Sequence, residues 1–233
     1  MLLEGRKALV SGGASGIGWA IAAQLAAAAV PTLVADVQPA HGLPDAVQFC
    51  PCDVASAADV HRLFAKVQDS LGTPDILVCS AGRGIHEKLT EGDPEKWRQV
   101  IDTNLLGVLR LVRAFVPGML QQGSGDVVFL SSVSARQAYP YGGVYAATKA
   151  ALEVVAATLR QEVLPTVRVT VIAPGVTDTP FFSHTISGFH TVQDIGFGAL
   201  SADDVARAVL YALRQPAGVS VNDITLRPTA QPF

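Results

Sequence analysis

A tyrosine and a lysine four residues apart, Tyr145 and Lys149, are the side chains in this sequence best placed to move a proton. On a helix this spacing puts both on one face, one turn apart. A free tyrosine has a pKa near 10, so acting as a base near neutral pH requires a fall of about 3 units, on the order of 4 kcal/mol. An ammonium one turn away, in a partly dry site, favours the phenolate. Tyr139 and Tyr141 lie ten and eight residues from the lysine, so they are weighed as packing residues.

A glycine-rich segment, Ser11–Gly18, follows the first apolar run and precedes an alanine-rich helical pattern. Gly12 can turn the chain sharply, Gly16 can let backbone approach a phosphate, and Gly18 can allow a helix to pack closely on a strand. A helix that begins here presents free N–H groups to an anion. The spacing is G-x-x-x-G-x-G rather than G-x-G-x-x-G, so the segment by itself predicts either a dinucleotide site or an ordinary glycine-rich turn.

Asp36 ends the second apolar run, 18 residues after Gly18. A carboxylate at this place accepts hydrogen bonds from the ribose hydroxyls of an adenosine and repels a 2′-phosphate. No arginine or lysine follows it in Val37–Pro39, and Ser15 in the glycine-rich segment is not basic. The sequence therefore favours NAD(H) over NADP(H), with a solvated turn aspartate as the alternative.

Further motifs lie in a fixed order along the chain: Asp53-Val54, Thr103-Asn104-Leu105, Ser132 placed 13 residues before Tyr145, and Pro174–Thr179. Together with the glycine-rich segment and the Tyr-Ala-Ala-Thr-Lys sequence that ends at Lys149, they resemble the short-chain dehydrogenase/reductase family of the single-domain Tyr-x-x-x-Lys type. The resemblance covers essentially the whole chain. It implies an enzyme that transfers a hydride between a nicotinamide cofactor and a hydroxyl/carbonyl pair.

The resemblance also implies roles for single residues. Tyr145 would be the general acid/base, and Ser132 would hydrogen-bond the same substrate oxygen. Lys149, together with an oxidised nicotinamide, would lower the pKa of the phenol and would hold the nicotinamide ribose. Asn104 would position a water that relays protons, although taken alone it also fits a helix-terminus hydrogen bonder. Residues expected to bind the cofactor are Gly12, Ser15, Gly16, Ile17, Gly18, Asp36, Asp53, Val54, Ala81, Gly82, Tyr145, Lys149, Pro174, Gly175, Val176, Thr177 and Thr179.

The chain departs from the family pattern at three places. Cys79-Ser80-Ala81-Gly82 stands where the family has Asn-Asn-Ala-Gly, which predicts weaker support of the central strand. Ser11 replaces the commoner threonine, and Ala29-Val30-Pro31 ends the first helix without a glycine. None of these departures touches the reacting atoms. Asp53 could instead be an ordinary turn residue at a strand end.

Short apolar runs alternate with helical patterns, which predicts a Rossmann-like, doubly wound α/β fold with about seven parallel strands and helices on both faces. Helix starts are marked by Ser56 and Ser201, each with an aspartate three residues later, and by Asp93 before a proline. Another helix is expected over 144–164. The predicted strands are Lys7–Ser11, Thr32–Asp36, Val47–Cys50, Asp75–Cys79, Asp126–Ser131, Arg168–Ala173 and Asp223–Leu226.

The helical and strand patterns lapse from about 176 to 200, where we expect a substrate lid within a single domain spanning 1–233. Its aromatic side chains suggest a fairly apolar secondary alcohol or ketone as the substrate, or else a cover for the cofactor or a contact between subunits. The residues concerned are Phe181, Phe182, His184, Phe189, His190 and Phe197.

Composition limits the partners. Hydrophobic residues make up 49% and charged residues only 16%, and the helices expected over 93–121 and 144–164 carry little charge on their outer faces, which favours a homodimer or homotetramer. A net charge of −3 without a basic run argues against nucleic acid. The uncharged stretch 8–35 is broken by glycines and serines, so no membrane or targeting segment is predicted. Three cysteines fit a reducing, cytoplasmic setting, and neither they nor the histidines suggest a metal site.

The sequence therefore predicts an NAD(H)-dependent oxidoreductase that interconverts a small secondary alcohol and a ketone. The alternatives are an NADP(H)-dependent carbonyl or 3-oxoacyl reductase, and a non-catalytic dinucleotide sensor. An epimerase or dehydratase is less compatible, because the short stretch after Ser201 cannot supply the larger substrate domain of those relatives.

Overall fold

Seven parallel strands form the central sheet, in the order β3-β2-β1-β4-β5-β6-β9, in a computed structural model that describes residues 3–188 and 191–232. The predicted strands match the observed ones to within one residue at each end. This order confirms the predicted doubly wound sheet. The strands are β1 (Ala8–Ser11), β2 (Thr32–Asp36), β3 (Val47–Pro51), β4 (Ile76–Cys79), β5 (Gly125–Leu130), β6 (Val167–Pro174) and β9 (Asp223–Leu226).

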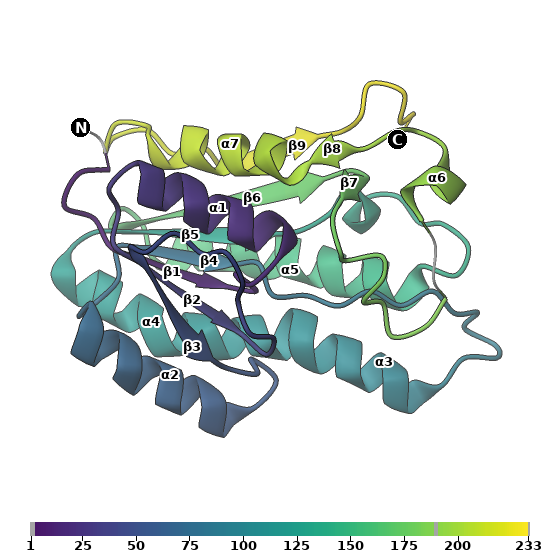
Figure 1. Cartoon of the computed structure of the whole chain (residues 1–233), viewed down its shortest axis with the longest axis horizontal. Coiled ribbons are helices and arrows are strands. Elements are labelled where there is room, and N and C mark those ends of the chain that lie inside the picture. The colour runs from purple at the N-terminus through teal and green to yellow at the C-terminus, as the bar shows by residue number, and fades with distance from the viewer. Residues whose placement is uncertain (1–2, 189–190, 233) are drawn as a thin grey trace.

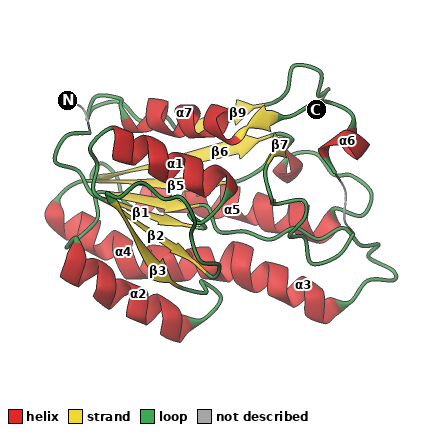
Figure 2. Cartoon of the chain, in the orientation of Figure 1, coloured by secondary structure: helices red, strands yellow, loops and turns green. Residues whose placement is uncertain are grey.

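Helices cover both faces of the sheet (Figures 1 and 2). One face carries α1 (Gly16–Ala27) and α7 (Ala202–Leu213), which pack against each other. The other face carries α2 (Ala57–Ser70), α4 (Val108–Gln122) and α5 (Gly143–Glu162). The sheet is therefore the middle of three layers, and the parallel strand connections run through these helices.

Because the strands are buried on both faces, their side chains divide between two core clusters. Leu9 and Leu77 pack in the cluster under α2, α4 and α5, whereas their neighbours Val10 and Val78 pack in the cluster under α1 and α7. All four are fully buried. Continuous apolar runs, rather than alternating ones, are what this two-sided burial requires.

The helices begin where the sequence signals predict. The Ser56 and Ser201 hydroxyls each accept the N–H of the aspartate three residues later, at 3.2 and 3.1 Å. The Asp93 carboxylate accepts the Glu95 N–H at 2.9 Å where α3 (Pro94–Ile101) begins. Each cap satisfies a backbone donor that has no partner within the helix.

The helical run over 93–121 differs from the prediction, because the structure divides it into α3, a π-helical turn at Asp102–Gly107, and α4. A π-helical turn changes the hydrogen-bond spacing, is rare, and is frequent at functional sites. By length and composition, residues 94–122 also pass as a membrane-spanning helix, the one such helix in the described part of the chain. However, Leu111, Phe115 and Met119 of α4 are buried against the sheet, as in a core helix.

The segment 176–200 is not devoid of regular structure. It contains β7 (Thr177–Asp178), the one-turn α6 (Val192–Ile195) and the start of β8 (Leu200–Ser201), which pairs in parallel with β7. These pieces lie beyond the carboxyl ends of the sheet strands (Figure 1). Phe189 and His190, two of the aromatic residues expected in a lid, lie outside the described residues.

Candidate active site

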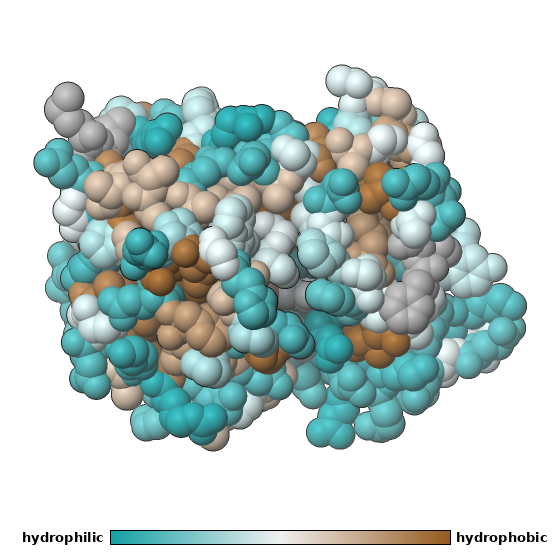
Figure 3. Space-filling view, in the orientation of Figure 1, coloured by the Kyte–Doolittle hydropathy of each residue, from teal (hydrophilic) through white to brown (hydrophobic). Residues whose placement is uncertain are grey.

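A cavity of about 1140 Å³ opens at the carboxyl ends of the strands, next to the point between β1 and β4 where the strand order reverses. Ligands of open α/β sheets bind in this crevice. Figure 3 shows the surface hollowed between the part formed by β1–β3 and the part that carries α3 and the loops. The wall includes every site residue that the sequence predicts except Asn104, which is fully buried beside it.

The glycine positions of the turn between β1 and α1 leave little or no room for a Cβ. Gly12 has a φ of +67°, and a Cβ there would lie 2.7 Å from the Cα of Ala81. A Cβ on Gly18 would lie 2.1 Å from the Gly12 carbonyl oxygen, and Gly16, with a φ of +53°, faces the side chain of Thr179. Glycine is therefore needed at all three positions for the turn to form.

Beyond this turn, α1 begins with its free N–H groups at the cavity. Gly16, Ile17 and Gly18 line the wall, and the first turn of α1 contains no acidic residue. Ser15 precedes the helix in an extended conformation, and its side chain makes no capping hydrogen bond. Such a helix end attracts an anion through its unpaired N–H groups and its partial positive charge.

The Asp36 carboxylate stands at the end of β2, tied to the glycine-rich turn. Its two oxygens accept the N–H groups of Ala14 and Gln38, both at 3.0 Å. An ionised carboxylate has about four acceptor positions, so Asp36 keeps capacity for hydroxyl donors. The two bonds hold the Asp36 carboxylate at the cavity wall, and its binding of a ribose stays a prediction.

Support for the chain after β4 comes from Ser11. Its hydroxyl accepts the N–H groups of Ser80 and Ala81 at 3.2 and 3.3 Å, and donates to the Val78 carbonyl at 3.3 Å. The sequence predicts weaker support here because Ser80 stands where the family has asparagine. The structure shows that the Ser11 hydroxyl, at the end of β1, holds the chain after β4 at Ser80 and Ala81.

Ser132, Tyr145 and Lys149 meet where β5 ends and α5 begins. Ser132 caps the short 3-10 helix Val133–Ala135, and its side chain is close enough to the Tyr145 phenol to lower the pKa of that group. The Lys149 ammonium lies 5.7 Å from the centroid of the Tyr145 ring and donates to the Leu130 carbonyl at 2.7 Å. The predicted sharing of one helix face is thus present in α5.

Burial shifts both ionisable groups of this trio. It raises the pKa of Tyr145 above its usual range, Tyr139 raises it further, and the nearby Ser132 side chain lowers it. Burial lowers the pKa of Lys149 to about 8. Loss of hydration is the largest cause of the raised pKa of Tyr145, and the Lys149 ammonium is bonded to the Leu130 carbonyl. That the lysine, together with an oxidised nicotinamide, lowers the pKa of the phenol stays a prediction.

Asn104 lies in the π-helical turn and uses its amide to hold neighbouring segments. Its Oδ1 accepts the Arg83 N–H at 2.7 Å, and its Nδ2 donates to the Arg83 carbonyl at 2.9 Å and to the Thr148 hydroxyl at 3.1 Å. The Thr148 hydroxyl in turn donates to the Tyr145 carbonyl at 2.7 Å. The amide therefore joins the chain after β4 to α5, and its predicted role in positioning a water stays a prediction.

The chain after β6 closes one side of the cavity with help from the C-terminal segment. A Cβ on Gly175 would lie 2.2 Å from Oε1 of Gln231, and this oxygen accepts the Val176 N–H at 3.0 Å. The Thr177 hydroxyl donates to the Gly175 carbonyl at 3.0 Å. No sequence motif points to Gln231, because its contact with Val176 spans 55 residues.

Asp53 and Val54 line the cavity after β3, the first exposed and the second buried. The Asp53 carboxylate accepts the Ala55 N–H at 2.9 Å, and the Val54 carbonyl accepts from Arg110 at 3.4 Å. Asp53 is therefore a turn residue at a strand end, as the alternative interpretation has it, and also part of the cavity wall.

Beside Tyr145 the cavity is lined by both aromatic and polar groups. The Phe181 ring lies 5.7 Å from the Tyr145 ring and 5.8 Å from the Phe182 ring, between centroids. His86 Nε2 lies 3.2 Å from the Tyr139 hydroxyl, and both residues line the cavity. Tyr139 is thus more than a packing residue, and this end is more polar than the sequence predicts. His86 was missed because no motif contains it.

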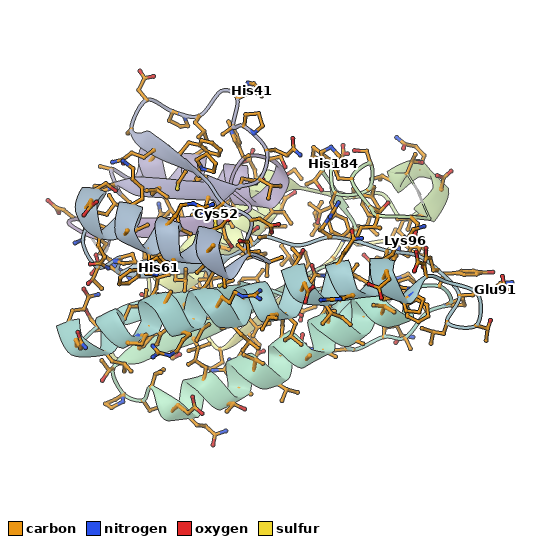
Figure 4. The ribbon with its side chains drawn as sticks, turned by 90° about the horizontal axis from the view of Figure 1, so that it is seen from below. His41, Cys52, His61, Glu91, Lys96 and His184 are labelled. Atoms are coloured by element: carbon orange, nitrogen blue, oxygen red, sulfur yellow. The ribbon has the colours of Figure 1, made fainter. Side chains whose placement is uncertain are left out.

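Among the described residues, no group of three or more His, Cys, Asp or Glu could hold a metal ion. Figure 4 shows His41, His61 and His184 on separate elements. Cys50, Cys52 and Cys79 are free thiols, and burial raises the pKa of Cys52 and Cys79 to about 12.

The wall of the cavity fits a dinucleotide. The glycine-rich turn, together with the free N–H groups of α1, suits a pyrophosphate, and the carboxylate of Asp36 suits ribose hydroxyls. Lys149, residues 174–177 and Thr179 also line this cavity.

Comparison with known proteins agrees with this geometry. A family model described as short chain dehydrogenase matches residues 6–188. Uncharacterized oxidoreductases of Staphylococcus saprophyticus and Staphylococcus aureus are each 36% identical to this chain over 97% of its length. The two matches cover 98% and 99% of the relatives' own lengths, respectively.

Solved structures match over nearly the full length. A closed form of serine dehydrogenase complexed with NADP+ has a TM-score of 0.90 at 27% identity, covering 97% of this chain and 96% of that one. An alcohol dehydrogenase from Thermococcus sibiricus complexed with 5-hydroxy-NADP has a TM-score of 0.87 at 30% identity, and the match covers 97% of each chain. A 3-ketoacyl-(acyl-carrier-protein) reductase from Brucella melitensis complexed with NADH has a TM-score of 0.88 at 25% identity, and the match covers 98% of this chain and 99% of that one. The chain belongs to the short-chain dehydrogenase/reductase family and is an oxidoreductase with a Rossmann-like fold.

Proposed function

We propose that this protein is an NAD(H)-dependent oxidoreductase that interconverts a secondary alcohol and a ketone by hydride transfer. The observation that carries the proposal is the convergence of Ser132, the Tyr145 phenol and the buried ammonium of Lys149, one helical turn from the tyrosine, in the wall of one cavity. The phenol and the serine hydroxyl are both in the cavity wall, where one substrate oxygen can contact both.

In this proposal, Tyr145 exchanges a proton with the carbinol or carbonyl oxygen, and Ser132 hydrogen-bonds the same oxygen. Lys149 favours the phenolate and binds the nicotinamide ribose. Asn104 acts as a positioning residue, since its amide holds Arg83 and Thr148 on either side of the site. When bound, an oxidised nicotinamide accepts the hydride and adds a positive charge near the phenol. That charge opposes the desolvation that raises the pKa of Tyr145.

Asp36 supports NAD(H) as the cofactor, because its carboxylate would repel a 2′-phosphate at the adenosine ribose. The alternative is an NADP(H)-dependent carbonyl or 3-oxoacyl reductase, and two of the structural relatives are complexed with NADP+ or an NADP derivative. We expect NADH to bind at least about 10-fold more tightly than NADPH, and Asp36→Ala to narrow this ratio severalfold, as measured by quenching of protein fluorescence. Equal affinities in the wild type would exclude NAD(H) selectivity.

For the substrate we propose a small alcohol or ketone held beneath a lid formed by about 176–200, within one domain spanning 1–233. Phe181 and Phe182 support an apolar part of the substrate, and His86 and Tyr139 support a polar part. A turnover screen of hydroxysteroids, hydroxy acids, sugar alcohols and aryl ketones, each with both cofactors, tests the enzymatic proposal. Turnover of none of them would favour the non-catalytic sensor.

We also propose that the protein is a homodimer or homotetramer in the cytoplasm. Large apolar side chains are exposed on the helices that pair between subunits in this family, with Leu109 of α4 at 38% and Val154 of α5 at 67% exposure. The reducing location is supported by the three free thiols.

A further inference from the structure

The segment 185–188, inside the proposed lid, lies against the chain that follows β4. The Ile186 N–H donates to the Gly84 carbonyl at 2.9 Å, and the His86 N–H donates to the Ser187 carbonyl at 3.1 Å. The approach is close, since a Cβ on Gly84 would lie 2.7 Å from the Thr185 side chain. These bonds run like a short strand pairing between two loops about 100 residues apart.

Glu87 is the side chain that fastens this pairing from the protein side. Its carboxylate accepts the Trp97 Nε1–H at 2.8 Å and the Asp93 N–H at 3.0 Å, and the Lys96 ammonium lies 3.6 Å away. These partners belong to the start of α3, so the carboxylate is held rigidly, with 14% of its side chain exposed. Its other partner is the Ser187 hydroxyl, which donates to Oε1. Glu87 therefore connects a stable helix to the lid segment.

His86 also contacts the lid segment, at Gly188, and links it to Tyr139 near the catalytic residues. Its Nδ1 lies 3.2 Å from the Gly188 carbonyl, and because a carbonyl only accepts, Nδ1 must carry the proton. Nε2 lies 3.2 Å from the Tyr139 hydroxyl. Tyr139 is close enough to Tyr145 to raise its pKa. The same lid contains Phe181, whose ring lies against the Tyr145 ring.

We infer that Glu87 is a positioning residue that fastens the lid in its closed position through Ser187, so that Phe181 is seated on Tyr145. The inference rests on the proposed function for its consequence in turnover, but not for the contact itself. Opening of the lid requires the Ser187–Glu87 bond to break together with the two backbone bonds, whereas α3 keeps Glu87 in place. Loss of the bond therefore loosens the lid without changing the catalytic side chains.

The test compares Ser187→Ala and Glu87→Gln with Glu91→Gln as the control. Glu91 forms a surface ion pair with Lys88, and Figure 4 shows it at the outer tip of the turn before α3. That end of the molecule is hydrophilic in the space-filling view (Figure 3). Ser187→Ala removes one lid contact and keeps every contact between Glu87 and α3, so it remains informative if Glu87→Gln folds poorly.

The first measurement is hydrogen exchange of the Ile186 amide in the free protein, which needs no turnover. We expect exchange at least about 10-fold faster in Ser187→Ala and in Glu87→Gln, with wild-type exchange in Glu91→Gln and in the amides of α4 and β5. The second measurement is steady-state kinetics on the best substrate, where KM should rise about 5-fold or more and kcat should change less than about 3-fold.

Unchanged exchange at Ile186 in Ser187→Ala would overturn the inference. So would equal acceleration throughout the sheet, because the contact would then stabilise the whole fold rather than the lid. Faster exchange at Ile186 in a protein that turns over no alcohol or ketone would support the fastening role of Glu87 and would contradict the proposed function instead.

Discussion

Replacing Lys149 by methionine should make the protein more stable at neutral pH, because the side chain holds a charge in the protein interior. Lys149 is 5% exposed, and burial lowers its pKa from 10.5 to about 8. A shift of about 2.5 units corresponds to about 3.4 kcal/mol at 1.36 kcal/mol per unit. Methionine loses the bond to the Leu130 carbonyl, a cost of about 1 kcal/mol. The expected net gain in the free energy of unfolding at pH 7 is therefore about 2 kcal/mol.

The direction of the pH dependence follows from proton binding. Below the folded pKa of about 8, Lys149 is protonated in both the folded and the unfolded chain, so the full cost of burial is present. Between about 8 and the unfolded value of 10.5, the unfolded chain binds more protons, so the stability of the wild type rises with pH. The difference in the free energy of unfolding between Lys149→Met and the wild type should therefore decrease over this pH range and reach zero or become negative.

Urea unfolding of both proteins at several pH values from about 7 to about 10.5 measures this difference. Lys66→Met is the control, since Lys66 is exposed on α2 and its replacement should change stability by less than about 0.5 kcal/mol at every pH. A Lys149→Met protein no more stable than the wild type at pH 7, or an advantage that stays constant up to pH 10.5, would refute the reasoning. A gain with the expected trend would show that the lysine is kept at the expense of stability.

Two further substitutions test the local structure and the proposed assembly. Ala29 is exposed and has a φ of +58° in the turn that ends α1. Ala29→Gly should therefore raise the free energy of unfolding by about 0.5–1 kcal/mol, measured by thermal or urea unfolding. A decrease in this free energy would contradict the left-handed conformation of residue 29. If the proposed oligomer forms through α4 and α5, Val154→Asp should convert it into monomers, as measured by light scattering. The control Val219→Asp, at a position that is 45% exposed and outside both helices, should leave the mass unchanged. An unchanged mass for Val154→Asp would place the interface elsewhere.

The strands and helix starts were accessible from the sequence because their causes are local. Apolar runs such as Ile76–Cys79 are buried on both faces whatever their neighbours are. Ser56 and Ser201 bond to N–H groups three residues away, so the signal and the structure lie within one turn. The glycine positions at 12, 16 and 18 also follow from a local need, the absence of room for a Cβ.

The features that the sequence did not predict depend on contacts between distant segments. Gln231 reaches Val176 across 55 residues, and Glu87 reaches Ser187 across 100, and neither contact has a local signature. The π-helical turn at Asp102–Gly107 has no recognisable composition. The pKa of Tyr145 also depended on the fold, because spacing along α5 describes the distance to Lys149 but not the desolvation of either group.

The most direct test of the central claim is the turnover of Tyr145→Phe measured alongside its affinity for NADH. Phenylalanine removes the hydroxyl near Ser132 and keeps the ring that packs on Phe181. If the phenol transfers the proton, turnover should fall at least about 100-fold while the dissociation constant of NADH changes less than about 3-fold. Turnover above about a tenth of the wild-type rate, with NADH still bound, would contradict the assignment of Tyr145 as the general acid/base.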